Sequence, residues 1–162
     1  MNNITRGTDH TGARRVREEF RWRNFNAFAA RLIKHRLVHF APLSIYILWQ
    51  FRDTCEDPDY AGASPAFMLN TTLDWLDSTS EELFADTQDL GINGRSLGKL
   101  YQIPSRGFDR PRWLFWAKRF AELSRDERLF DGPTRRRAAG AAEKIMRHFG
   151  EATDSDSRTD GE

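Results

Sequence analysis

The sequence predicts an all-α protein, a compact bundle of about five helices with disordered N- and C-terminal tails. In each of five stretches, apolar side chains recur at intervals of three and four residues, as on one face of an α-helix. Residue types that begin or end helices flank these stretches, and no run alternates polar and apolar residues like a strand. No heptad pattern is sustained, which favours crossed helices over a long coiled coil.

The two ends of the chain differ in composition from the segment between them. Residues 1–13 are rich in Asn, Thr and Gly, and residues 151–162 repeat Asp and Ser. Neither end has enough apolar side chains to offset the entropy that ordering would cost. We therefore expect a disordered tail over residues 1–13, a single helical domain over residues 14–150 and a disordered acidic tail over residues 151–162.

Two helices are expected in the first part of the domain. The first spans Arg15 to Arg36 and ends in a basic turn. The second has Pro42 in its first turn, and the run from Leu43 to Phe51 leaves it almost no polar face, so it should be the most buried. The apolar residues of the first helix share one face, which we expect in the core: Phe25, Phe28, Ala29, Leu32 and Ile33.

Helix-start signals place the other three helices. Ser64 is expected to cap a third helix, which is apolar on one side and acidic on the other. A glycine-rich connection over residues 91–107 follows and is expected to run over the surface. Asp109 should cap a fourth helix, with Phe108 and Trp113 at the spacing of a hydrophobic staple. Asp131 or Gly132 should cap the last helix, whose apolar face is rich in alanine.

Several short segments in these helices and helix starts match a family pattern. These segments are Asn26–Leu32, Tyr46–Trp49 with Arg52–Asp53, Gly107–Phe108, Arg112–Trp113 and Trp116. Through them the chain resembles an uncharacterised family of filamentous-fungal (ascomycete) proteins, a domain of unknown function, over roughly residues 24–148. This resemblance implies no activity.

The cysteine content and the lengths of the apolar runs limit the cellular compartments that we expect for this protein. Cys55 is the only cysteine, so neither an intrachain disulfide nor a thiolate zinc site can form. The first residues contain no apolar run typical of a signal peptide, and the longest apolar stretch, Leu43 to Trp49, is too short to span a membrane. We expect an intracellular protein of the cytoplasm or nucleus that is not secreted and has no membrane partner.

The sequence identifies no catalytic residue, cofactor or metal. His35 and His39 have the spacing of two metal ligands, but a third ligand is not evident and a helix end explains them. The segment Gly94–Leu100 is one residue short of a phosphate-binding loop and lacks its hydroxyl. Cys55 lies beside acids that raise the pKa of a thiol. An enzyme of unrecognised type would need a deep pocket with convergent polar groups.

Charge is strongly segregated along the chain. Net charge is +7 over residues 1–52, −10 over residues 53–92, +8 over residues 93–150 and −4 over residues 151–162. Two explanations stay open. The segments can pack beside one another and neutralise each other, or they can recognise a charged partner.

These charges give the candidate binding residues. The leading hypothesis is a non-enzymatic protein-interaction or scaffold module that uses the acidic third helix or the basic first helix around an exposed Trp22. The alternative is weak, sequence-independent nucleic-acid binding through the arginines of the first helix. A second basic run, Arg135–Arg137, begins the last helix. Partner identity and oligomeric state stay open. The candidate residues are Arg14, Arg15, Arg17, Arg21, Trp22 and Arg23 on the first helix and Asp74, Asp77 and Glu81 on the third.

Overall fold

The described part of the chain is entirely helical apart from its connections, which confirms the all-α prediction. A computed structural model describes residues 10–57, 63–90 and 97–150. Within these residues no helix combines the length and the apolar character needed to cross a membrane. The helices, in chain order, are α1 (His10–Lys34), the short 3-10 helix η1 (Ala41–Leu43), α2 (Ser44–Cys55), α3 (Pro65–Ala85), α5 (Arg110–Leu123) and α6 (Gly132–Phe149).

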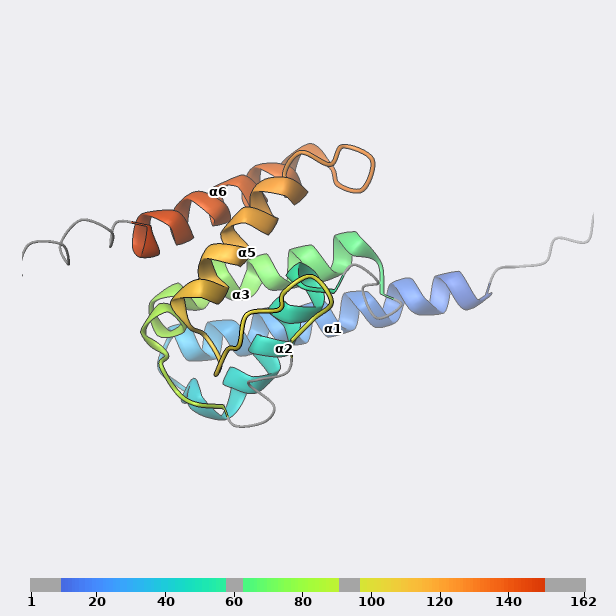
Figure 1. The fold of residues 1–162 in the computed structure, drawn as a ribbon. Helices are drawn as coiled ribbons and strands as arrows, with labels where there is room; N and C mark the ends of the chain where they lie inside the picture. Colours follow the sequence, from blue (N-terminus) through green and yellow to red (C-terminus); the bar gives the residue numbers. More distant parts are fainter. Residues whose placement is uncertain (1–9, 58–62, 91–96, 151–162) are drawn as a thin grey trace, which may run out of the picture.

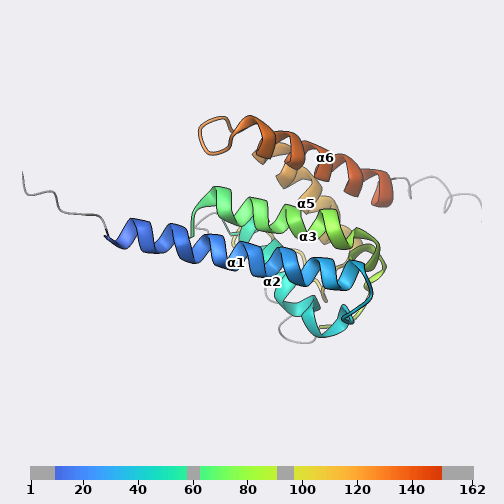
Figure 2. The same ribbon diagram turned by 180° about the vertical axis from the view of Figure 1, so that it is seen from behind.

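Helix α3 lies at the centre of the bundle. Figures 1 and 2 show α3 between α1 on one side and α6 on the other, and α2 also packs against α3. Helices α5 and α6 form the most extensive helix pair, and the first turns of α1 project beyond the start of α3. An acidic helix is therefore placed between two basic ones.

Three helix starts have the predicted caps. The side chains of Ser64, Asp109 and Asp131 accept hydrogen bonds from the backbone N–H three residues ahead, and a proline lies in each first turn. The Phe108 and Trp113 rings stack with centroids 5.7 Å apart, which confirms the staple before α5. These contacts are local, so they could be predicted from sequence.

Helix α1 differs from the prediction in its start and in its buried face. It begins at His10, so residues 10–13, which we placed in the tail, are helical. Phe25 and Phe28, expected in the core, are 59% and 56% exposed. Ala29 and Ile33 of the predicted face are buried, together with Asn26 and Ala30.

The reason for this orientation is a buried hydrogen bond between α1 and α3. Trp75 Nε1 donates to Asn26 Oδ1 over 3.0 Å, and both side chains are buried. Ala29 and Ala30 lie on the same face of α1, and their small side chains allow the helices to approach closely. This bond gives the indole N–H a partner that its buried position would otherwise deny it.

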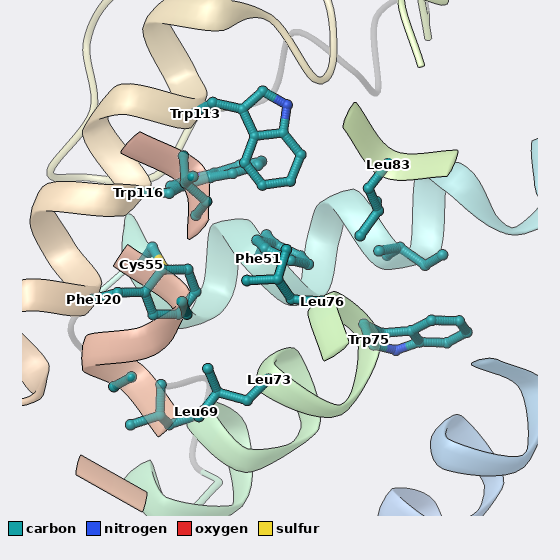
Figure 3. Close-up of a cluster of buried hydrophobic side chains, with 14 of the residues drawn as sticks. Phe51, Cys55, Leu69, Leu73, Trp75, Leu76, Leu83, Trp113, Trp116 and Phe120 are labelled. Atoms are coloured by element: carbon teal, nitrogen blue, oxygen red, sulfur yellow. The ribbon is translucent and has the colours of Figure 1, made fainter. Parts of the chain in front are cut away.

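The core is centred on Phe51 of α2. Its ring packs against Trp113, Trp116 and Phe120 of α5, and Figure 3 shows Leu76 of α3 beside it. Trp75 points away from this cluster, towards α1 (Figure 3). Helix α2 is not buried all round, because Tyr46 is exposed on the side that α3 and α5 do not cover.

The connection before α5 is partly buried, in contrast to the surface path that we predicted. Tyr101, Ser105 and Phe108 are buried, and Gly98 packs against Glu56 so closely that a Cβ at Gly98 would lie 2.4 Å from the Glu56 Cβ. Leu90 N also donates to Arg106 O over 3.0 Å. Residues 91–96 of this connection lie outside the described residues.

A fully buried ion pair holds this connection to α2 and α5. Arg112 Nε and Nη2 donate to Glu56 Oε1 and Oε2 over 2.6 and 3.0 Å. Glu56 Oε1 also accepts from Trp116 Nε1 at 2.8 Å, and Oε2 accepts from Gly98 N at 2.9 Å. The carboxylate is therefore fully hydrogen-bonded, as a buried charge must be.

Replacing Glu56 by glutamine tests this pair. Glu56→Gln leaves the buried Arg112 charge without its counter-charge, so we expect a loss of about 3 kcal/mol in the free energy of unfolding. Urea denaturation, monitored by circular dichroism, measures this free energy. Glu143→Gln, at an exposed position on α6, is the matched control and should stay within about 0.5 kcal/mol of the parent chain. Equal effects of the two substitutions would show that the pair does not hold the fold.

Candidate functional site

The structure brings together residues that the sequence analysis assigned to two separate surfaces. Arg23 of α1 donates from Nε to Asp74 Oδ2 of α3 over 2.8 Å. Arg137 of α6 donates from Nη2 to Asp74 Oδ1 over 2.7 Å and to Asp77 Oδ2 over 2.9 Å. The Asp74 carboxylate of α3 therefore binds both α1 and α6.

Polar residues around Arg137 complete this cluster. Arg137 Nη1 donates to Asn70 Oδ1 over 2.9 Å, and Asn70 Nδ2 donates to Thr134 Oγ1 over 3.2 Å. Burial lowers the pKa of Arg137, but the hydrogen bonds to Asp77 and Asp74 and their charges outweigh burial, so the pKa is raised. Arg137 therefore stays charged and bound to α3.

A shallow depression lies beside the cluster, between α1 and α3. Its volume is about 340 Å³, and its lining includes Phe20, Arg23, Arg31, Asp74 and Asp77. The charged groups on its wall largely neutralise one another. It therefore gives little electrostatic preference for either sign of ligand.

Two further predicted arginines are engaged within α1. Arg14 Nε donates to Glu18 over 2.9 Å, and Arg15 Nε donates to Glu19 over 3.1 Å. Glu19 also accepts from Ser64 N and Oγ at 2.9 and 2.8 Å, which fixes the start of α3 on α1. Burial raises the pKa of Glu19, but the hydrogen bonds from Ser64 and Arg15 outweigh it and lower the pKa.

The other predicted residues face solvent. Arg17, Arg21 and Glu81 are exposed and form no ion pair within the described part of the chain. Trp22 is 54% exposed, and its ring stacks on Phe25 with centroids 5.7 Å apart. These side chains are free to contact a partner.

Sequence reasoning missed the aromatic half of one exposed surface of α1. Residues at intervals of three and four form one line along the solvent side of α1, and all are exposed. We name this line the outer stripe of α1. Its N-terminal half is basic and its C-terminal half is aromatic. The spacing was visible in the sequence, but we assigned the two phenylalanines to the core. The outer stripe consists of Arg14, Arg17, Arg21, Phe25 and Phe28.

The weaker motifs of the sequence do not assemble into a site. His35 and His39 are exposed beyond the end of α1, and the described residues contain no group of three or more potential metal ligands among His, Cys, Asp and Glu. Burial raises the pKa of the Cys55 thiol well above its usual range, so it is not a nucleophile. Residues 94–96 of the loop-like motif lie outside the described residues.

Comparison with known proteins places the chain in a family. The sequence pattern described as "Protein of unknown function (DUF3632)" matches residues 3–120. The chain belongs to this family. The matched segment includes α1, α2, α3 and most of α5, whereas α6, which supplies Arg137, lies beyond it. No curated protein and no solved structure matches the chain.

Two aspartates on α3 provide a matched test of the charge cluster. Asp74 binds two arginines and its side chain is 17% exposed, whereas Asp77 binds Arg137 alone and is 53% exposed. We expect Asp74→Asn to lower the free energy of unfolding by about 1 kcal/mol and Asp77→Asn by about half as much or less. Urea denaturation at low and high salt measures both. Equal losses would contradict a shared role for Asp74.

Proposed function

We propose that this chain is a protein-interaction module that binds an acidic amphipathic helix of a partner protein along the outer stripe of α1. The observation that carries the proposal is the exposure of Phe25 and Phe28 in line with a row of arginines. A helix-sized partner matches this surface because its own side chains repeat at the same intervals.

The aromatic half of the stripe supports a protein partner. Phe25 and Phe28 each leave more than half of their surface in water, and Trp22 stacks on Phe25 beside them. Clustered exposed aromatic rings are typical of interaction sites, since burying them against apolar side chains is favourable and restricts few torsions. An apolar face of a partner helix would cover this half.

The basic half selects the charge of the partner. Arg17 and Arg21 form no ion pair within the described residues, so a partner carboxylate would meet them without displacing an internal bond. Arg14 has Glu18 as a partner and contributes less. Acidic residues one or two turns before the apolar face would therefore set the direction and register of the bound helix.

The nucleic-acid alternative uses the same arginines. Three of its five arginines, Arg14, Arg15 and Arg23, already bind carboxylates of this chain. Phosphate contacts also leave Phe28 without a role. These observations favour the protein partner, and the test below distinguishes the two.

A photoreactive amino acid at position 28 tests the proposal, with the same group at the exposed control position Leu129. We expect position 28 to cross-link to one acidic, amphipathic segment of a partner protein. Nuclease treatment should leave these cross-links unchanged. That segment, made as a peptide, should bind the full chain in fluorescence anisotropy. Phe28→Asp should weaken binding about 30-fold, since an aromatic anchor at an interface is worth about 2 kcal/mol. Arg21→Glu should weaken it most at low salt.

Three outcomes would overturn the proposal. Cross-links that disappear with nuclease, together with steeply salt-dependent binding of an oligonucleotide, would establish the nucleic-acid alternative. Cross-links to a second copy of the chain would identify self-association instead. Peptide binding that Phe28→Asp and Leu129→Asp weaken equally would show that the outer stripe is not the docking surface.

A further inference from the structure

A second surface, remote from the outer stripe, has the form of a small-molecule pocket. A depression of about 610 Å³ lies where the C-terminal ends of α3 and α6 meet the N-terminal end of α5. This volume is within the range of ligand sites in proteins. Phe84, Phe108 and Phe149 form its apolar walls, and Asp86 is also part of its lining.

The three aromatic walls are held by one buried residue. The rings of Phe84, Phe108 and Phe149 contact Trp113 with centroids 5.0, 5.7 and 5.6 Å apart, and Trp113 is fully buried. Arg110 Nε also donates to Phe149 O over 2.9 Å, which joins the start of α5 to the end of α6. The pocket is therefore preformed, and a ligand would not have to order its walls.

Asp86 supplies the only buried carboxylate in the described lining that lacks a full set of partners. It is 7% exposed, and its Oδ1 accepts from Gln88 N at 3.0 Å, but its Oδ2 is buried without a hydrogen-bond partner. Asp109, which also lines the pocket, differs because it binds Arg112 N, Ser105 Oγ and Arg106 N. A buried carboxylate oxygen without a donor is costly and is uncommon without a functional reason.

The remaining charges of the pocket lie in water. Arg106 and Arg110 are exposed at its edge, so solvent screens their attraction for an anion. The buried Asp86 is screened far less and should dominate the choice of ligand charge. A second depression of about 360 Å³ on the other side of Asp86 is lined by Phe40 and Glu82 but lacks the three aromatic walls.

We propose that this pocket binds an aromatic primary amine, with its ring against Phe84, Phe108 and Phe149 and its ammonium group donating to the Asp86 carboxylate. The aromatic faces favour a flat apolar ring and are compatible with a nearby cation. The polar groups of the lining do not include a nucleophile paired with a base, so the assignment is binding and not catalysis. None of the lining residues comes from α1, so this proposal is independent of the outer stripe.

Three probes that share a phenylethyl group test the charge preference. Calorimetric titration of the full chain with 2-phenylethylamine, 3-phenylpropanoate and 2-phenylethanol compares an amine, a carboxylate and a neutral alcohol on the same ring. We expect the amine to bind at least tenfold more tightly than the carboxylate. In nuclear magnetic resonance spectra, the shifted signals should include the Trp113 indole and the three phenylalanine rings.

Asp86→Asn is the matched variant, because it keeps the shape of the side chain and an oxygen for Gln88 N. It should lower the affinity for the amine at least tenfold and change that for the alcohol less than twofold. Glu143→Gln, an exposed charge change on α6, should leave all three affinities unchanged.

The variant is also expected to fold. Burial raises the pKa of Asp86, only partly opposed by the hydrogen bond from Gln88 N. Folding therefore disfavours the ionised form, and removing the charge should keep or raise the unfolding temperature at pH 7. No binding of the amine at millimolar concentration, equal binding by Asp86→Asn, or a preference for the carboxylate would each overturn the proposal.

Discussion

The fold depends above all on the buried pair between Glu56 and Arg112. Glu56 ends α2, and its carboxylate binds Arg112 and Trp116 of α5 and the backbone of Gly98. Burying two opposite charges contributes little net stability. The buried pair is compatible only with a packing of the helices in which every hydrogen-bond partner is present. The pair therefore fixes where α5 begins relative to α2, and α5 in turn carries Trp113 and the aromatic walls of the pocket.

The sequence predicted those features that neighbouring residues determine. Capping by Ser64, Asp109 and Asp131 involves residues three positions apart, and the staple of Phe108 and Trp113 involves five. The number and order of the helices follow from such signals. Family membership adds no function to this prediction.

The rest depends on contacts between residues far apart in the chain. Hydrophobic periodicity placed Phe25 in the core, whereas α1 turns Asn26 towards Trp75 of α3 and leaves Phe25 in water. Likewise, Asp86 directly follows an acidic helix and is nevertheless buried. Its burial follows from the packing of three chain segments around it, and no spacing rule within α3 could reveal that arrangement.

The segregation of charge along the chain has a structural explanation in part, because basic α1 and basic α6 pack on either side of acidic α3. Asp74 binds Arg23 on one side and Arg137 on the other. These two arginines belong to different helices, yet each depends on the same carboxylate. In evolutionary terms, a change at position 74 alters selection at positions 23 and 137 at once. The residues at these two positions should therefore covary among homologues through the aspartate between them.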